Sequence, residues 1–246
     1  MKRLIWFEEI ATFVGKSSFC KKLLRGFYDF FYAGRIKKSK NEIFHKNALK
    51  LLSEFDHYMS YNKIPYFLAF GTLLGAVREK GFIKHDMDID VGLWNTTDRA
   101  KVQNILERAG FRLIRRILVD EGEFACEETY EYQNVSIDLF YFYPYDGNLS
   151  SLCAFVTHPD SLSWRKEIQK YGGLVPLQLM LPVSHKIIYT DFSGLSLPIP
   201  ENFAEFLECR YGHEYMIPDP TFVYPKMGSQ PHKYRYDKLG VVYGKY

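Results

Sequence analysis

The sequence predicts an α+β fold in which helices flank one central mixed β-sheet. The 246 residues are 47% hydrophobic and 25% charged. This supplies one large core and excludes long disorder, collagen and low-complexity sequence. Apolar residues recur at helical spacing in some segments and alternate as in strands in others. Helical patterns dominate the first half of the chain and strand patterns the second, without internal repeats.

The first forty residues differ in charge from the rest. Residues 1–40 hold ten Lys or Arg against three Asp or Glu, a balance of +7, whereas the whole chain carries +3. Apolar residues in 4–32 recur every three or four positions between these cations, so we predict that residues 1–38 form a basic amphipathic helical segment. Packing on the domain and peripheral contact with an anionic membrane both remain open. The overall charge is too near balance to predict a nucleic-acid partner.

The expected location is cytoplasmic, with peripheral contact at the inner face of the cytoplasmic membrane through residues 1–38. No run of 18 apolar residues is present, and Glu8 and Glu9 stand where a signal peptide needs its apolar stretch. The cysteines are widely separated and form no CxxC pair. Reduced thiols, and neither a disulfide framework nor a zinc site, are therefore expected.

Capping residues and apolar runs predict the first helices and strands after this segment. Residues 39–42 (Ser-Lys-Asn-Glu) fit a capping box that opens a helix ending at residues 62–65. The apolar run 66–70 predicts a buried strand, and the following helix, 72–79, begins at Gly71-Thr72. A second strand is predicted over residues 88–94.

Most of the remaining chain shows strand patterns. A helix capped by Thr97 and Asp98 ends at Gly110. The further predictions, in chain order, are strands 111–119, 123–132, 135–143 and 152–157, helix 164–171, a hairpin of 187–191 and 195–199, and helix 202–210. Residues 39–220 are thus predicted to form one domain. Residues 221–246, rich in Pro, Tyr and Lys, are predicted to form an extended tail.

Four acidic residues are the strongest candidates for a metal site. Asp86, Asp88 and Asp90 alternate, so on a strand their side chains would project to one face. Carboxylates crowded in this way repel one another and stay ionised only with a cation among them. Ligands that are all oxygen atoms indicate Mg²⁺ or Mn²⁺. Asp138 is a lone acid inside an apolar strand, which is costly unless a metal or another partner satisfies it, so it is expected to join them.

Five further residues are candidates for binding phosphate or substrate. Gly71 and Thr72 stand at a helix N-terminus, where backbone N–H groups bind anions and glycine permits close approach. Arg78 is expected to reach the same phosphates with a bidentate fork. Lys84 and His85 are further candidate substrate contacts. The alternatives are an exposed acidic loop, a salt-bridged strand acid at position 138, and a solvated helix residue at position 78.

Residues 71–94, GTLLGAVREKGFIKHDMDIDVGLW, closely resemble the signature of the LicD/fukutin family within the nucleotidyltransferase-like superfamily. That superfamily pairs a G[GST] turn with a DxD strand and a later Asp, which residues 71–72, 88–90 and 138 match in order. The family's acidic run is commonly W-D-D-D-I-D, and this chain has His85 and Met87 at its first and third positions. A second match, to the F-x-G, iP-x-n and Y-G elements of the family's C-terminal pattern together with Leu207, covers residues 192–212.

The resemblance implies a nucleotidyltransferase-like core and metal-dependent transfer of a phospho-alcohol group, such as phosphocholine or ribitol phosphate. The donor is CDP-linked, the acceptor is a sugar hydroxyl of a cell-surface glycan or glycolipid, and CMP is released. Asp88 and Asp90 are implied to hold Mg²⁺ against the diphosphate, supported by Asp86, while Asp138 shares a second ion or acts as base. A bacterial capsule or lipopolysaccharide pathway is the expected setting.

Two alternatives to this function remain. One is a true nucleotidyltransferase, which attaches a nucleoside monophosphate and releases pyrophosphate. The other is a catalytically inactive binding protein at the membrane surface. The identity of the released product separates the first alternative from the predicted reaction, and Mg²⁺ binding argues against the second.

Overall fold

The computed structural model describes residues 34–84, 86–147, 149–156, 163–219 and 231–244, with side chains from residue 41 onward. The chain divides into two units, residues 1–46 and 47–246, and the second unit contains the sheet. Most of the predicted basic segment, residues 1–33, lies outside the described residues. Among the helices that are described, none combines the length and apolar character needed to cross a membrane.

Helix α3 (Gly34–Tyr61) does not begin at the predicted capping box. It already runs from Gly34, so Ser39 lies inside it. Neither Gly nor Pro occurs between residues 35 and 61, and serine inside a helix costs less than about 0.7 kcal/mol relative to alanine. The helix therefore continues through this position. Its buried stripe from residue 48 onward is Ala48, Leu51, Leu52, Phe55 and Met59.

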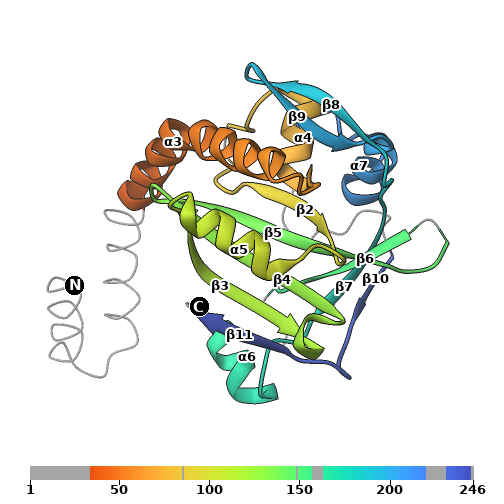
Figure 1. Ribbon diagram of the computed structural model, residues 1–246. Helices are drawn as coiled ribbons and strands as arrows, with labels where there is room; N and C mark the ends of the chain where they lie inside the picture. The colour runs from red at the N-terminus through yellow and green to blue at the C-terminus, as the bar shows by residue number, and fades with distance from the viewer. Residues whose placement is uncertain (1–33, 85, 148, 157–162, 220–230, 245–246) are drawn as a thin grey trace, which may run out of the picture. The chain divides into compact units, whose positions relative to one another are not determined.

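A nine-stranded mixed sheet forms the core of residues 47–246 (Figure 1). The strand order is β10-β7-β6-β5-β4-β3-β11, and β2 joins β5 on one side and β1 on the other. The β2–β5 pair is parallel, and the other pairs described are antiparallel. The strands are β1 (Phe67–Leu68), β2 (Asp90–Trp94), β3 (Arg112–Val119), β4 (Ala125–Tyr132), β5 (Val135–Pro144), β6 (Leu149–Ala154), β7 (Leu177–Pro182), β10 (His232–Tyr234) and β11 (Gly240–Gly244). The predicted α+β class is confirmed.

Helices cover both faces of this sheet (Figure 1). On one face, α5 (Arg99–Arg108) contacts β3, where Arg116 donates a hydrogen bond to Gln103 at 2.9 Å. On the other face lie α4 (Phe70–Arg78) and α7 (Phe203–Tyr211). The ring of Phe70 packs edge-on against Phe140 of β5 with centroids 5.0 Å apart. Further elements are the short 3-10 helix η2 (Asp120–Gly122), α6 (Trp164–Tyr171) and the separate hairpin of β8 (Ile187–Phe192) and β9 (Leu195–Pro200).

The strand–helix–strand unit that carries the predicted motif differs from the prediction at three boundaries. Strand β1 has two residues, and α4 begins at Phe70 rather than Thr72. Strand β2 begins at Asp90 rather than Asp88. The amide N–H of Asp90 donates to the Thr72 side chain and not to a neighbouring strand. The residues before Asp90 consequently form an extended loop.

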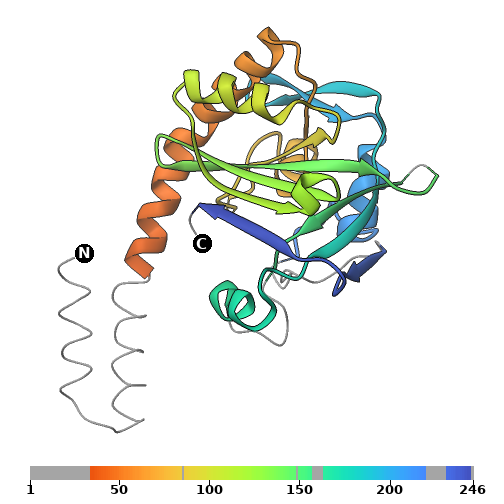
Figure 2. The same cartoon turned by 60° about the horizontal axis from the view of Figure 1, so that its bottom comes forward.

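Three strands lie where none was predicted. Strand β7 occupies residues for which no element was predicted, and Pro182 is its last residue. Residues 231–244 of the predicted extended tail contribute β10 and β11 (Figure 2). These strands pair with β7 and β3, which would otherwise expose unpaired edges. This part of the tail therefore belongs to the sheet, while residues 220–230 lie outside the described residues.

Candidate active site

The parallel pairing of β2 with β5 brings together two predicted catalytic residues that are far apart in the sequence. In the register of this pair Asp90 lies beside Asp138, and the Asp138 amide donates to the Ile89 carbonyl at 2.7 Å. Neighbouring strands are about 4.8 Å apart, and residues in register project to the same face. The two carboxyl groups therefore lie next to each other on the α4 side of the sheet.

The connection between β1 and α4 fixes the position of Asp90. Gly71 N donates to Asp90 Oδ2 at 3.3 Å, and Asp90 N donates to Thr72 Oγ1 at 2.8 Å. The Ala69 amide donates to the Asp90 carbonyl at 3.0 Å. A carboxylate beside a helix N-terminus is favoured electrostatically. Gly71 and Thr72 thus hold an acidic residue in place, while their predicted contact with phosphate stays a prediction.

Phe70 makes the sharp turn from β1 into α4. Its φ of 43° lies in the left-handed region, which costs an aromatic residue about 1–3 kcal/mol. Its ring packs against Phe140 at 5.0 Å and Phe206 at 5.7 Å, and this packing offsets the strain. The turn points the Gly71 N–H toward Asp90.

Asp86 and Asp88 reach the site from the loop and not from a strand. The pKa of Asp86 is raised to about 8. Burial is the largest cause, and the hydrogen bond with Asp88 and the charge of Asp88 add to it. Burial also raises the pKa of Asp90, as do the charges of Asp88, Asp138 and Asp86. Such shifts arise where carboxylates crowd together without a counter-charge. The structure therefore brings together all four predicted aspartates.

These four carboxyl groups have the chemistry of a site for a divalent cation. Among the described residues, none of Asp86, Asp88 and Asp90 forms an ion pair with Lys or Arg. Oxygen ligands suit Mg²⁺ and Mn²⁺. As the side chains stand, no three His, Cys, Asp or Glu residues in the described part of the chain surround a common point that would hold a metal. Side-chain rotation would be needed to close the site.

Gly71→Ala is expected to disturb this site more than it disturbs folding. An alanine Cβ at position 71 would lie 2.4 Å from Asp86 Oδ2 and 3.6 Å from Asp90 Oδ2. Asp86 must move away, and because its carboxylate is the end of a side chain, it moves without shifting the backbone. We expect loss of activity and of any Mg²⁺-dependent rise in melting temperature, with the metal-free melting temperature nearly unchanged. A fully active variant would show that this space is not needed.

The other predicted substrate contacts are not gathered around Gly71. Arg78 ends α4, where its Nε lies 3.0 Å from Glu79 Oε1 and its Nη1 donates to the Tyr215 carbonyl at 3.4 Å. Seven residues of helix separate it from Gly71 by about 10 Å along the axis. Lys84 is exposed before the acidic loop. His85 lies outside the described residues.

The β8–β9 turn packs against residues 80–82, and the end of α7 lies near the aspartates. Ser193 N donates to the Lys80 carbonyl at 2.7 Å, and the rings of Phe192 and Phe82 pack edge-on at 4.8 Å. Burial raises the pKa of Tyr211 at the end of α7, and the charges of Asp90, Asp86 and Asp88 raise it further. Tyr211 of the predicted C-terminal motif therefore lies near the aspartates, while Phe192 and Ser193 contact residues 80–82 ahead of them.

Three polar residues beside Asp138 were not predicted from the sequence. Thr129 Oγ1 donates to Asp138 Oδ1 at 2.5 Å. Arg115 Nη2 lies 3.1 Å from Glu127 Oε1 and 3.6 Å from Asp138 Oδ1. The pKa of Glu127 is raised to about 8 by burial and by the charge of Asp138, against the lowering effect of Arg115. The signal that singled out Asp138, a lone acid inside an apolar strand, is absent at position 127, because Glu128 and Glu131 stand in the same predicted strand.

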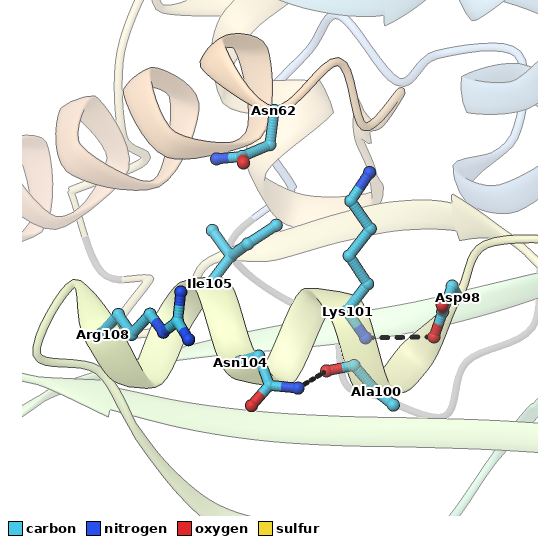
Figure 3. Close-up of a pocket in the computed structure, with 7 residues that line it drawn as sticks. All are labelled: Asn62, Asp98, Ala100, Lys101, Asn104, Ile105 and Arg108. Atoms are coloured by element: carbon cyan, nitrogen blue, oxygen red, sulfur yellow. Dashed lines mark hydrogen bonds between the residues drawn. The ribbon is translucent and has the colours of Figure 1, made fainter.

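The described residues also form two pockets beside α5, of about 420 and 460 Å³. The first opens between the end of α3 and α5 (Figure 3). Its polar groups bond within the helix: Lys101 N donates to Asp98 Oδ1 at 3.0 Å, and the Asn104 amide donates to the Ala100 carbonyl at 2.9 Å. Because α5 covers the face opposite α4, these pockets are separate from the acidic site.

The sequence of this chain is similar to a known protein family and to named members of it. A family model described as LicD/FKTN/FKRP, nucleotidyltransferase domain, matches residues 63–202, which are more than half of the chain. Ribitol-5-phosphate transferase FKTN of Mus musculus is 23% identical over 181 residues, 73% of this chain and 35% of that protein. Ribitol 5-phosphate transferase FKRP of Homo sapiens is 25% identical over 173 residues, 68% of this chain and 31% of that protein.

This chain spans about a third of the length of these curated relatives. The family match covers the acidic residues at 86, 88, 90 and 138 together with the β8–β9 hairpin. The resemblance predicted from residues 71–94 is confirmed, and the chain belongs to the LicD/FKTN/FKRP nucleotidyltransferase-domain family.

Proposed function

We propose that this chain transfers a phospho-alcohol group from a CDP-linked donor to a hydroxyl group of a glycan or glycolipid, with release of CMP. The pairing of Asp90 with Asp138 beside the N-terminus of α4 carries the proposal. Carboxylates next to a helix N-terminus suit a divalent cation and a phosphate bound together. The names of the relatives, ribitol-5-phosphate transferases, support the class of group transferred.

Mg²⁺ or Mn²⁺ is the proposed cofactor, held by Asp88 and Asp90 with support from Asp86. When bound, the ion would neutralise the diphosphate of the donor and orient it for in-line displacement. The raised pKa values of Asp86 and Asp90 support this assignment, because a cation among crowded carboxylates relieves the repulsion between them. A nucleotidyltransferase-like core is proposed from the same arrangement.

The acceptor would react at the Asp138 side of the site. The hydroxyl oxygen attacks the phosphorus that carries the alcohol, and a new O–P bond forms as the bond from that phosphorus to the CMP oxygen breaks. The hydroxyl proton passes to the Asp138 carboxylate, which acts as general base. The N–H groups at the start of α4 are the proposed contacts for the phosphate oxygens.

A donor screen tests this function. The full chain is incubated with MgCl₂, a glycan acceptor and CDP-ribitol, CDP-choline or CDP-glycerol in turn. We expect release of CMP with one donor and a matching gain in acceptor mass, and neither from the Asp90→Asn variant. Release of pyrophosphate from CTP would instead indicate a nucleotidyltransferase. No CMP from any donor would count against the proposal.

The cellular location stays a proposal with its own test. A cytoplasmic enzyme that contacts an anionic membrane through residues 1–38 would bring the site to a lipid-linked acceptor. Binding to vesicles that contain anionic lipid is expected for the full chain and not for a chain that lacks residues 1–35. Equal binding by both would contradict a membrane role for this segment.

A further inference from the structure

A polar row crosses four strands on the face that carries the acidic site. In the register of the sheet, Asp90 of β2 lies beside Asp138 of β5, and Asp138 lies beside Thr129 of β4. Thr129 in turn lies beside Arg115 of β3. Residues in register on neighbouring strands project to the same face. Arg115 therefore points to the same face as the two aspartates.

The contacts to Asp138 are concentrated on one of its two oxygens. Thr129 Oγ1 donates to Oδ1 at 2.5 Å, and Arg115 Nη2 is 3.6 Å from that same atom. No hydrogen bond from the described residues reaches Oδ2. Oδ1 is thus restrained, whereas Oδ2 is available to take part in the reaction.

Arg115 is itself held from two sides. Its Nη2 lies 3.1 Å from Glu127 Oε1, and its Cζ lies 5.0 Å from the ring centroid of Trp164 on α6. The side chain of Glu127 is 7% exposed and that of Arg115 is 23% exposed. A carboxylate as buried as that of Glu127 needs a partner for its charge. The guanidinium therefore has a fixed place.

This arrangement is not the one that stability alone would favour. The Nε of Arg115 is buried and makes no hydrogen bond within the described residues. A buried donor without a partner costs stability. A single nitrogen, Nη2, approaches both acids, at 3.1 Å from Glu127 Oε1 and 3.6 Å from Asp138 Oδ1, while Nε has no partner among the described residues.

We propose that Arg115 is a positioning residue for Asp138. Held by Glu127 and Trp164, it fixes the Asp138 carboxylate so that Oδ2 faces the reacting hydroxyl group. The inference rests on the proposed function, in which Asp138 takes the proton of the acceptor. Groups that orient a catalytic or metal-binding side chain typically change activity by about 10–100-fold when they are removed.

A matched control lies on the same two strands. Arg112 Nη2 is 2.5 Å from Glu131 Oε1, and these side chains are 58% and 31% exposed. This pair also joins β3 to β4, but it has no contact with Asp138. Arg112→Ala therefore removes a comparable cross-strand ion pair and leaves the polar row from Asp90 to Arg115 unchanged.

The first test compares kinetic constants of purified variants with the donor found in the screen. Arg115→Ala is expected to lower kcat by about 10–100-fold with little change in KM, whereas Arg112→Ala leaves both unchanged. Added guanidinium ion should restore part of the activity of Arg115→Ala by occupying the space over Trp164. Wild-type kcat in Arg115→Ala, with Asp138→Ala inactive, would overturn the inference and leave the proposed function standing.

A double-mutant cycle tests the role of Glu127. Glu127→Gln is expected to lower kcat in the wild-type background and to have no further effect in Arg115→Ala, because it acts through Arg115. Fully additive losses would overturn that coupling.

If Arg115→Ala does not fold, Arg115→Lys keeps the charge that Glu127 needs. Its kcat should still fall, because an ammonium group lacks the planar guanidinium that lies over the Trp164 ring, and an unchanged kcat would overturn the proposal.

A crystal structure of Arg115→Ala, or of Arg115→Lys if the alanine variant does not fold, supplies a readout that does not depend on any donor. We expect the Asp138 carboxylate to be rotated or to occupy more than one orientation. An Asp138 carboxylate placed as in the wild-type protein would overturn the inference, even if the donor screen has yielded no CMP.

Discussion

Asp90→Asn is expected to lower kcat by about a thousandfold, a loss of the size seen when one preorganised electrostatic contact is removed. Asparagine keeps the shape of the side chain and an oxygen to accept from Gly71 N, which lies 3.3 Å from Asp90 Oδ2. It removes only the charge. CMP release by the purified variant, measured with the donor identified in the screen, checks this expectation.

The same substitution should leave the metal-free protein as stable as the wild type or more stable. Asp90 is buried among Asp88, Asp138 and Asp86, whose charges raise its pKa, so a neutral side chain removes repulsion. Lost activity with an equal or higher melting temperature would mark a functional charge. Asp146→Asn, at an exposed position, is the control and should change neither quantity. Wild-type kcat in Asp90→Asn would refute the assignment of the site.

Mg²⁺ is expected to stabilise the protein more strongly as the pH rises. The pKa of Asp86 in the folded protein is about 8, whereas an unfolded aspartate titrates near about 4. Between these values the folded state binds more protons than the unfolded state, so the free energy of unfolding of the metal-free protein falls with rising pH. Mg²⁺ needs the ionised carboxylates and should reverse this loss.

The expected size of the effect follows from ligand linkage. At a hundredfold excess over its Kd, Mg²⁺ adds about 2.7 kcal/mol, which raises the melting temperature of a protein of this length by about 5–10 °C. Melting curves with MgCl₂ and with EDTA are compared at about pH 5 and about pH 8. The difference between the two curves at each pH cancels other titrating groups such as Glu127. An equal Mg²⁺ effect at both pH values, or an undiminished one in Asp90→Asn, would contradict a carboxylate metal site.

Local sequence patterns predicted most of the elements of residues 47–246. Periodicity and end signals place α6 at residues 164–171, as observed, and the hairpin and α7 within one residue. The turn at Gly71 and the aspartates at 86, 88 and 90 were found because short-range spacing defines them, and Asp138 because it is a lone acid inside an apolar strand. The start of β2 and the formation of the last two strands depend on contacts with distant residues. Strand β2 starts at Asp90 because Thr72 takes its amide N–H, and β10 and β11 form because β7 and β3 offer free edges.

The sequence by itself thus determined the α+β class, the acidic motif and the expected chemistry, because each depends on residues close together in the chain or on their type. Only the tertiary structure decided which side chains share a row. Asp90, Asp138, Thr129 and Arg115 come from four strands, and sheet register alone makes them neighbours. It also decided that Gly71 and Thr72 hold Asp90 and that Arg78 lies at the far end of α4. Hydrogen bonds between strands act across any sequence distance, so the pairing of β2 with β5, whose paired residues are 48 positions apart, follows from the tertiary structure and not from a local pattern.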